Sequence, residues 1–266
     1  MSLIRKTRGR TFCVLFNLRA LVKGVDTRMR FDARRKKFRA VSKKYELSFF
    51  HEAQAYYACK RGIERRIEIL ADTYFLPTIR FAPGDVVVDC GANVGELCLY
   101  FRDRGVPVEY IGIEPSPLEF ECMKENVAPA QAINVGLWSS DGELDFFVSS
   151  QMADSSLIEP QHYDKVIKVP TRRLDGLLAG RRIKLLKLEA EGAEPEVIRG
   201  CAGLLARIEY VSADVGFERG KAQTNTMAAV TNYLLANGFE LVDVGQKRLV
   251  ALYRNVALAG ARDAAR

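Results

Sequence analysis

A short loop with two glycines and two carboxylates follows a run of three valines, in the stretch VVVDCGANVGELCLYF at residues 86–101. Dinucleotide-binding loops cradle a pyrophosphate with the pattern G-x-G-x-x-G. Gly91 fits its first position, but Asn93 and Glu96 occupy the other two. In a dinucleotide-binding loop the second glycine lets the backbone approach the pyrophosphate, and the third lets helix and strand pack closely. This chain lacks both of them. Because Asp89 and Glu96 also add negative charge, the loop is predicted to receive a cation rather than a phosphate.

A further acidic residue stands at the end of the next predicted strand, in the sequence GIEPSP. This residue, Glu114, follows Gly95 by nineteen positions, and a carboxylate there can accept hydrogen bonds from both hydroxyls of a ribose. S-adenosylmethionine fits these residues, because it carries a ribose, a sulfonium and an α-ammonium but no phosphate. We therefore predict that it is bound through Asp89, Gly91, Asn93, Gly95, Glu96 and Glu114.

Acidic residues also follow two later predicted strands, in the sequences KLEAEGAEP and VSADVG. The carboxyl ends of parallel strands meet at one edge of a sheet, so Glu189, Glu191 and Asp214 are expected near Gly91 and are the candidate catalytic residues. A carboxylate there could orient an acceptor hydroxyl or take its proton, while most of the rate would come from holding the oxygen in line with the methyl group. For Glu191 and Glu194 a structural alternative stays open, since acidic residues also favour the start of a helix.

Cysteine and histidine are too scattered for a metal site. The six cysteines form no C-x-x-C pair, and the two histidines are His51 and His162. No zinc site is therefore predicted, and unpaired thiols suit a reducing, cytoplasmic compartment. His162, in the polar stretch EPQHYDK, is either a candidate base or a surface residue without a role. His51 is expected to be structural or part of a lid, and the lone Trp138 is expected to be a core or turn residue.

The elements that must position these residues alternate between strand and helix. Continuous β-branched runs predict strands buried on both faces, and helical periodicity with end signals such as Ser116 and Gly238 predicts the helices. The last two strands follow each other without a helix, so one of them must run antiparallel. The order predicts an α/β fold with a doubly wound, Rossmann-like sheet that ends in an antiparallel hairpin. The predicted strands are 86–88, 109–113, 132–135, 183–188, 209–213, 239–244 and 248–253.

The charge of the chain is divided unevenly. Residues 1–44 contain fifteen Lys and Arg against two Asp, whereas the remainder holds 25 basic and 31 acidic residues. A basic arm joined to a mildly acidic body indicates an anionic partner for the arm. Residues 27–44 are so charged that we expect a solvated linker or an exposed helix. Residues 48–76 show helical spacing.

The basic arm begins with a predicted amphipathic helix. Phe12 and Phe16 stand off its apolar face. Such a helix can lie on an anionic membrane, which predicts peripheral association at the inner membrane face through residues 1–44. The alternative is a helix docked on its own domain or on a sister subunit. No stretch approaches the length of a transmembrane span. The apolar face consists of Val14, Leu15, Leu18, Leu21, Val22 and Val25.

Four segments resemble one enzyme family. VVVDCGANVGELCLYF, IGIEPSP, TRRLDGLL and IKLLKLEAEGAEPEVIRG are together similar to the FkbM-type S-adenosylmethionine-dependent methyltransferases, over about residues 83–254. The most specific block is Glu-Gly-Ala-Glu at 191–194. The resemblance implies a class I methyltransferase sheet and methylation of hydroxyls on sugars, glycans or polyketide-type natural products. Glu189 and Asp214 stand where the family commonly has Asp and Glu.

We therefore expect an S-adenosylmethionine-dependent O-methyltransferase that acts on a hydroxyl of a sugar, glycan or related natural product. Two alternatives stay open: an RNA methyltransferase whose arm contacts phosphates, and a cofactor-binding scaffold without catalysis. The acidic body and the lack of any Pro-Pro pair count against nucleic acid as the partner. The clustered carboxylates count against the scaffold.

The expected organisation has four parts. A basic arm with the amphipathic helix occupies 1–44, and a helical lid or cap occupies 45–82. The methyltransferase domain follows at 83–255, and 256–266 form a C-terminal tail.

Overall fold

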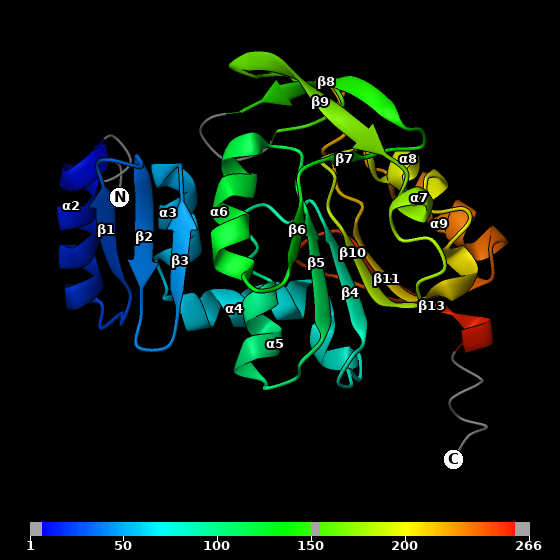
Figure 1. Ribbon diagram of the computed structural model, residues 1–266, viewed down its shortest axis with the longest axis horizontal. Coiled ribbons are helices and arrows are strands. Elements are labelled where there is room, and N and C mark those ends of the chain that lie inside the picture. Colours follow the sequence, from blue (N-terminus) through cyan, green and yellow to red (C-terminus); the bar gives the residue numbers. More distant parts are fainter. Residues whose placement is uncertain (1–6, 150–154, 259–266) are drawn as a thin grey trace.

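The computed structural model describes residues 7–149 and 155–258 (Figure 1). Its central feature is a seven-stranded sheet in which neighbouring strands are parallel except at β13, which runs antiparallel to both of its neighbours. The predicted doubly wound sheet with a terminal antiparallel hairpin is thereby confirmed. In spatial order the strands are β12 (Phe239–Val244), β13 (Val250–Asn255), β11 (Ile208–Asp214), β10 (Ile183–Leu188), β4 (Val86–Cys90), β5 (Glu109–Ile113) and β6 (Gln131–Ile133).

Helices cover both faces of this sheet. Alternate residues of one strand point to opposite faces, so Val86 and Val88 pack with α8 and α9, whereas Val87 packs with α4, α5 and α6. Strands covered on both faces are expected to be continuously apolar, as β4 and β10 largely are. The helices are α4 (Ile63–Thr73), α5 (Cys98–Asp103), α6 (Pro117–Val127), α7 (Leu174–Leu177), α8 (Glu194–Arg199) and α9 (Met227–Ala236), with short 3₁₀ turns η1 (Leu76–Thr78) and η2 (Leu205–Arg207).

A second, three-stranded sheet interrupts the alternation after β6. It consists of β7 (Gly136–Leu137), β9 (Lys165–Arg172) and β8 (Gly142–Val148), in that order, and lies at the top of Figure 1. Phe146 and Val148 of β8 pack with Val169 of β9 in a small core of their own. This sheet supplies one wall of the cavity that opens at the strand ends.

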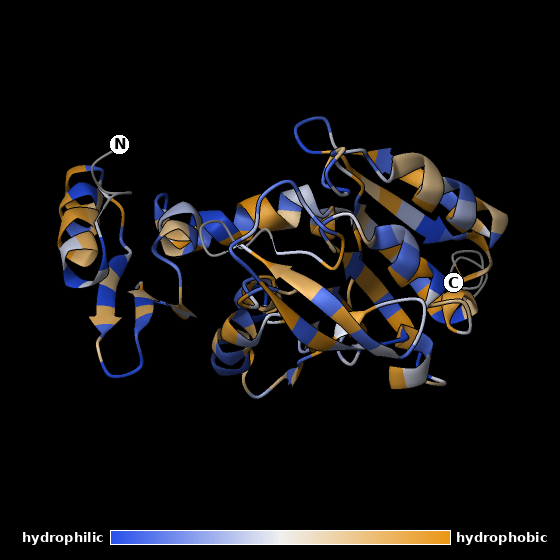
Figure 2. Ribbon diagram, turned by 90° about the horizontal axis from the view of Figure 1, so that it is seen from above, coloured by the Kyte–Doolittle hydropathy of each residue, from blue (hydrophilic) through white to orange (hydrophobic). Residues whose placement is uncertain are grey.

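Residues 7–62 form a folded unit rather than an arm. Its strands β1 (Arg28–Asp32), β2 (Lys37–Val41) and β3 (Glu46–Phe49) make an antiparallel sheet, and helices α2 (Gly9–Val22) and α3 (Glu52–Cys59) lie on one side of it, as Figures 1 and 2 show. The linker or exposed helix expected at 27–44 is therefore wrong. Met29, Phe38 and Ala40 are buried while Arg30 and Arg39 are exposed, so a half-buried strand pattern was hidden among the charges.

The unit is joined firmly to the domain that contains the central sheet. Its core includes Val94, Leu99 and Cys122 from the α5 and α6 side of the central sheet. Asn126 of α6 accepts a hydrogen bond from the backbone of Ser48 at 2.8 Å and donates one back at 3.1 Å. The boundary predicted between residues 44 and 45 is wrong, because it separates β2 from its neighbour β3. Most of the tail expected at 256–266 lies outside the described residues.

The helix expected to continue from 48 to 76 is interrupted twice. Residues 46–49 are strand β3, and α3 and α4 are separated by Gly62, whose φ of +97° is left-handed. At α2 most of the predicted apolar stripe is exposed, so the alternative in which this stripe docks on its own domain is not what the structure shows. Phe12 and Phe16, which stand off the apolar stripe, are the residues that pack into the core.

Candidate active site

A cavity of about 430 Å³ opens where the parallel strands end. This size falls within the range of about 300–1,000 Å³ that is typical of small-molecule sites. One wall comes from Gln54, Tyr57 and Arg66 of the N-terminal unit and α4, and another from Phe146 and Ser156 beside β8. The floor is made by the strand ends, whose lining residues include Asp89, Gly91, Asn93, Glu96, Glu114, Glu189 and Glu191.

The two glycines of the loop allow close packing against neighbouring elements. Gly91 has a φ of +66°, and a Cβ there would lie 1.8 Å from the carbonyl oxygen of Glu189. Gly95 has a φ of +78°, and a Cβ there would lie 2.3 Å from a methyl carbon of Val127 on α6. A side chain at Gly91 would push the loop away from the end of β10, and one at Gly95 would push it away from α6. The two glycines therefore let the loop pack closely against the sheet on one side and against α6 on the other.

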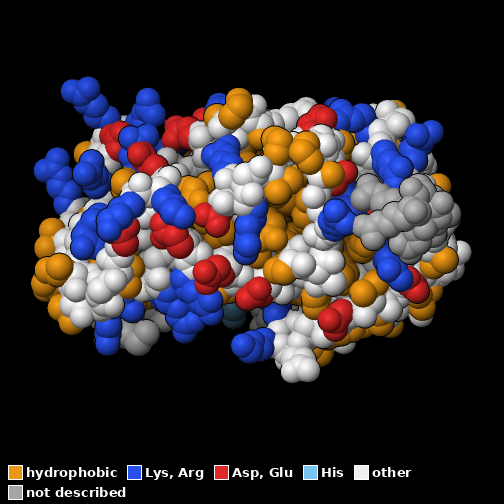
Figure 3. All heavy atoms as spheres, turned by 90° about the horizontal axis from the view of Figure 1, so that it is seen from below, with side chains coloured by type: hydrophobic (Ala, Val, Ile, Leu, Met, Phe, Trp, Pro, Cys, Tyr) orange, Lys and Arg blue, Asp and Glu red, His pale blue; other side chains and the backbone are white. Residues whose placement is uncertain are grey.

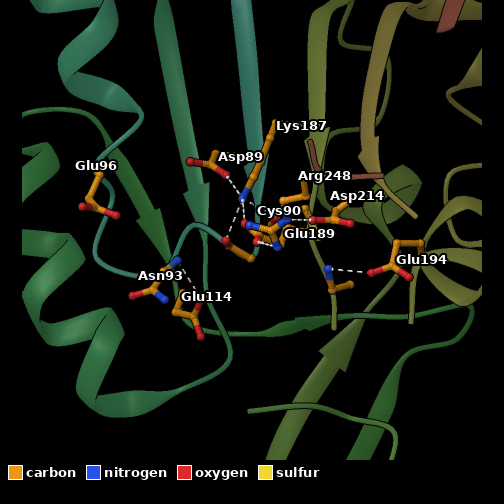
Figure 4. Close-up of polar contacts among 12 residues, drawn as sticks. Asp89, Cys90, Asn93, Glu96, Glu114, Lys187, Glu189, Glu194, Asp214 and Arg248 are labelled. Carbon is orange, nitrogen blue, oxygen red and sulfur yellow. Dashed lines mark hydrogen bonds and ion pairs between the residues drawn. The ribbon is translucent and has the colours of Figure 1, made fainter. Parts of the chain in front are cut away.

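Glu114 lies under this loop, at the end of β5. Its carboxylate accepts hydrogen bonds from the backbone N–H of Asn93 at 2.8 Å and of Ser116 at 2.9 Å (Figure 4). Burial raises the pKa of Glu114 to about 8, although these two N–H groups favour the charged form. A buried carboxylate of this kind gains from further hydroxyl donors. The cavity wall at Glu114 therefore fits the ribose of S-adenosylmethionine.

The loop's other two carboxylates are already paired with cations of the chain. Asp89 forms an ion pair with Lys187 at 2.9 Å and accepts a hydrogen bond from the Tyr110 hydroxyl at 2.5 Å. The Glu96 carboxylate accepts hydrogen bonds from Arg66 Nε at 3.0 Å and from Arg66 Nη2 at 2.8 Å. The negative charge that was expected to attract a cation is thus balanced within the protein. Direct contact of Asp89 or Glu96 with the cofactor stays a prediction.

Lys187 ties the loop to the sheet. It lies opposite Asp89 in the register of β10 and β4, and its ammonium also donates to the carbonyl oxygens of Gly91 at 2.9 Å and Cys90 at 3.3 Å. Burial disfavours its charge, but the carboxylates of Asp89 and Glu189 outweigh burial and raise the pKa of Lys187. The lysine is therefore charged and fixes the loop that carries the predicted cofactor contacts.

Three carboxylates surround the guanidinium of Arg248, which lies between β12 and β13. Arg248 Nη2 lies 2.5 Å from Glu189 Oε1 and 3.3 Å from Glu218 Oε1, and Nε pairs with Asp214. Figure 4 shows Arg248, Glu189, Asp214 and Lys187 grouped together, with Glu96 and Glu194 on either side. The structure thus brings the predicted pair Glu189 and Asp214 into one cluster. Two cationic side chains that the sequence did not reveal, Lys187 and Arg248, pair with these carboxylates.

The members of the cluster differ sharply in acidity. Burial opposes the charge of Glu189, but Lys187 and Arg248 lower its pKa to about 2. Burial raises the pKa of Glu218 to about 8, and the nearby charge of Asp214 adds to the increase while Arg248 opposes it. Burial also raises the pKa of Asp214. One cluster therefore holds a permanent anion, Glu189, beside a carboxyl that gains and loses a proton near neutral pH.

Glu194 and Glu191 have different surroundings. Glu194 is buried and accepts hydrogen bonds from the backbone N–H of Ala190 at 2.9 Å and Gly192 at 3.1 Å, and from the Thr226 hydroxyl at 3.0 Å. Its role is to close the turn before α8, in agreement with the structural alternative. Glu191 lines the cavity with a left-handed φ of +49°, and its carbonyl oxygen accepts a hydrogen bond from Ser156 at 2.8 Å.

The remaining candidates lie away from the chemistry. His51 precedes α3 and pairs with Glu119 of α6 at 3.2 Å, so it joins the N-terminal unit to the main domain. His162 is exposed, outside the lining of the cavity. Trp138 follows β7 and donates its backbone N–H to Arg172. Among the described residues, no group of three or more His, Cys, Asp or Glu is arranged to hold a metal ion.

Lys187, Arg248 and Glu218 were missed because their partners are distant in the sequence. A lysine inside the apolar run IKLLKL was a usable signal, since a buried lysine needs an acidic partner. Arg248 and Glu218 stand in polar loop sequences that resemble any solvated turn. Arg248 comes beside Glu189 because β13 of the terminal hairpin pairs with β11, which is the neighbour of β10, and Glu218 is brought there by the loop that follows β11.

Comparison with known proteins identifies the domain. Residues 89–241 match the model of the methyltransferase FkbM domain. Methyltransferase sdnD of Sordaria araneosa is 26% identical, with 50% of this chain and 73% of that protein covered. Methyltransferase 1 of Beauveria bassiana is also 26% identical, with 45% of this chain and 59% of that protein covered. The chain thus spans less than two thirds of the second relative's length.

Among solved structures, a putative tRNA (m1A22) methyltransferase of Streptococcus pneumoniae in complex with S-adenosyl-L-methionine aligns with 72% of this chain and 72% of its own, at 13% identity and a TM-score of 0.40. The family match covers the loop at Gly91, Glu114 and the strand ends at Glu189 and Asp214. The chain belongs to the FkbM family of methyltransferases, enzymes that use S-adenosylmethionine as the methyl donor.

Proposed function

We propose that this enzyme methylates a hydroxyl oxygen of a sugar, glycan, lipid-linked saccharide or related natural product. The observation that carries the proposal is the pair of unlike carboxylates at the cavity wall. Burial and the charge of Asp214 raise the pKa of Glu218 to about 8. By contrast, Lys187 and Arg248 lower the pKa of Glu189 to about 2. A hydroxyl must lose its proton as the new bond forms, and a base with a pKa near the working pH serves that step best.

Each carboxylate receives a separate role in this proposal. Glu218 accepts the proton of the acceptor hydroxyl, because its carboxylate form is available above a pH of about 8 and still partly populated at neutral pH. Glu189 is too weak a base to do so, and instead it accepts a hydrogen bond that orients the acceptor. Arg248 holds both side chains in place. Asp214 lies behind Arg248, buried, and fixes the guanidinium.

The cofactor would be held by the opposite side of the cavity. Glu114 would accept hydrogen bonds from the ribose, and Gly91 and Asn93 would border the amino-acid end. S-adenosylmethionine supplies an activated methyl group when bound. The protein's own contribution is to keep the acceptor oxygen in line with that group, which is worth more to the rate than the proton transfer alone.

The proposal includes a place of action at an anionic membrane surface. Residues 7–62 contain fifteen Lys and Arg against four acidic residues, Asp26, Asp32, Glu46 and Glu52. An excess of this size attracts anionic surfaces over roughly a Debye length, about 8 Å at physiological salt. Among the described residues, no helix is long and apolar enough to cross a bilayer.

RNA is the second candidate acceptor, because the same basic unit could contact phosphates. A base such as Glu218 fits an acceptor that must lose a proton, which is true of a saccharide hydroxyl and not of an unprotonated ring nitrogen of a nucleobase. The acidic body of the chain and the lack of a Pro-Pro pair count further against RNA.

The test is transfer of an isotopically labelled methyl group from S-adenosylmethionine to a panel of saccharides, lipid-linked saccharides and RNA. The expected product carries a methyl ether on a saccharide oxygen. A label that enters RNA or a nitrogen atom, with every saccharide unlabelled, would overturn the proposal.

A further inference from the structure

Helix α2 is apolar on two opposite faces. Its inner face packs Phe12, Phe16 and Ala20 into the core of the N-terminal unit. A helix that is apolar all round is normally covered all round, yet the other face lies open at the end of the molecule farthest from the central sheet (Figures 1 and 2). We call this face the α2 outer stripe; it comprises Val14, Leu18, Leu21 and Val22, which are 65%, 59%, 66% and 75% exposed.

The charges around the stripe are of one sign. Arg10 lies one turn before Val14, and Lys23 directly follows Val22; both are exposed. The first acidic residue of the chain is Asp26, so α2 itself carries no negative charge. Figure 3 shows basic side chains concentrated over this end of the molecule, with apolar side chains at its outer edge. An apolar face whose own helix carries cations and no anion complements a surface that combines hydrocarbon with phosphate.

The stripe is preorganised, because hydrogen bonds fix α2 to the rest of the N-terminal unit. The Asn17 side chain donates to the carbonyl oxygen of Met29 at 2.9 Å and accepts from its N–H at 2.7 Å, which fixes α2 to β1. Arg19 donates to the carbonyl oxygen of Lys60 at 2.8 Å, which fixes it to the end of α3. Binding therefore requires no folding of α2, and no ordering cost opposes it.

We propose that the α2 outer stripe inserts into the interfacial region of an anionic lipid membrane, with Arg10 and Lys23 at the level of the headgroup phosphates. A second protein would be expected to supply acidic groups matched to individual cations, whereas lipid phosphates meet a row of cations at any register. This inference sharpens the proposed place of action to four side chains. It does not depend on the identity of the methyl acceptor.

The test is flotation of the purified full chain with vesicles of phosphatidylcholine alone and of phosphatidylcholine mixed with phosphatidylserine. We expect recovery with the mixed vesicles only. Leu18→Asp combined with Leu21→Asp should reduce binding about tenfold or more, since each change removes one apolar side chain from the lipid. Arg10→Gln combined with Lys23→Gln should reduce it about tenfold. The matched control is Leu235→Asp, at a side chain of α9 that is 47% exposed.

Two further measurements keep the outcome unambiguous. Thermal unfolding and calorimetric binding of S-adenosylmethionine should be unchanged in every variant, which shows that the fold and the cofactor site are intact. Light scattering should show the same mass for wild type and for the stripe variant. Equal flotation of the wild type and the stripe variant would overturn the proposal. So would a dimer that the stripe substitutions dissociate while vesicle binding persists.

Discussion

At the residue scale, the site shows how environment gives different tasks to chemically similar side chains. Glu189 and Glu218 share Arg248, but only Glu189 also contacts Lys187. The second cation lowers the pKa of Glu189 to about 2. Glu218, with burial and Asp214 against its charge, has a pKa of about 8. The same cluster therefore provides both an orienting anion and a proton acceptor.

The first prediction concerns Glu218. Glu218→Gln should lower kcat by about 10²–10⁴-fold, because the acceptor proton loses its base. In the wild type, kcat/KM should rise with pH up to about 8, since only the carboxylate form accepts a proton. The variant should lose this rise. Rates measured from pH 6 to 9 are compared with those of the exposed control Glu143→Gln, and an unchanged profile in Glu218→Gln would refute the role.

The second prediction concerns the stability of the cofactor-free chain. Burial raises the pKa of Glu114 from an ordinary 4.5 to about 8. The unfolded chain therefore loses this proton more readily than the folded one, and stability contributed by the protonated form is lost as pH rises from about 4.5 to about 8. Glu114→Gln removes this dependence. The quantity to follow is the free energy of unfolding of the variant minus that of the wild type. As pH rises through that range, this difference should increase by a few kcal/mol, since one pKa unit is worth about 1.4 kcal/mol.

Denaturant titrations at pH 5 and pH 8 measure this difference. The exposed Glu121→Gln on α6 is the control and should show no such trend. A relative stability that is constant with pH would mean that Glu114 is ionised in the folded chain throughout the range.

The sequence correctly predicted the position of those site residues that stand at the carboxyl end of a predicted strand. Glu114, Glu189 and Asp214 all end strands, and parallel strands end at one edge. It could not reach Glu218 and Arg248, whose neighbours are set by the path of a loop and a hairpin. The sequence also did not show that the charge of Asp89 is balanced by Lys187.

At the element scale, the loop between β4 and α5 depends on how closely it packs. The third prediction compares two glycines with nearly the same backbone angle. Gly91→Ala places a Cβ against the Glu189 carbonyl, whereas Gly105→Ala, at a φ of +64°, meets no atom within 4 Å. Gly105→Ala should cost about 1–2 kcal/mol, the usual cost of a left-handed residue. Gly91→Ala should cost at least about 3 kcal/mol and abolish cofactor binding.

Chemical denaturation and calorimetry of both variants measure these effects. If both substitutions cost the same, the close approach of Gly91 to β10 has no energetic weight. If Gly91→Ala still binds S-adenosylmethionine as the wild type does, the loop does not shape the site.

Strand prediction worked for the buried parallel strands and failed for β1 and β2. Strands β5, β10 and β12 have the predicted bounds, because short apolar stretches between turn and helix signals admit few alternatives. The terminal strand begins at Val250 rather than at the predicted 248. In β1 and β2 every second residue is charged, and the density of charge outweighed the period-two pattern. The helix at α2 was predicted, but its packed face was not, since two apolar faces give no periodic contrast.

At the scale of the whole molecule, the N-terminal unit and the methyltransferase domain share a core. The fourth prediction is that removal of residues 1–62 exposes Val94, Leu99 and Cys122, which pack with that unit. The truncated chain should aggregate or unfold well below the wild-type temperature, because an exposed apolar patch of this kind promotes association. Thermal unfolding and light scattering measure it. A truncated chain that stays monomeric and binds the cofactor would show that the unit is a separate arm.

The shared core also explains why the domain boundary could not be found from the sequence. A change of composition at Lys44 marks a change of surface charge, whereas a boundary depends on which side chains are buried together. Removing residues 1–44 would leave β3 without its neighbour β2. Substitutions on the α2 outer stripe are therefore the better test of membrane binding than deletion.

The most direct test of the account is calorimetric titration of S-adenosylmethionine and of NAD into the wild type, Glu114→Gln and Glu121→Gln. The wild type and Glu121→Gln should bind S-adenosylmethionine saturably at one site, and neither should bind NAD. Glu114→Gln should lose at least about tenfold in affinity for S-adenosylmethionine, because one charged acceptor is removed from the ribose. Wild-type affinity in Glu114→Gln would contradict the placement of the cofactor, and saturable binding of NAD in place of S-adenosylmethionine would contradict the account as a whole.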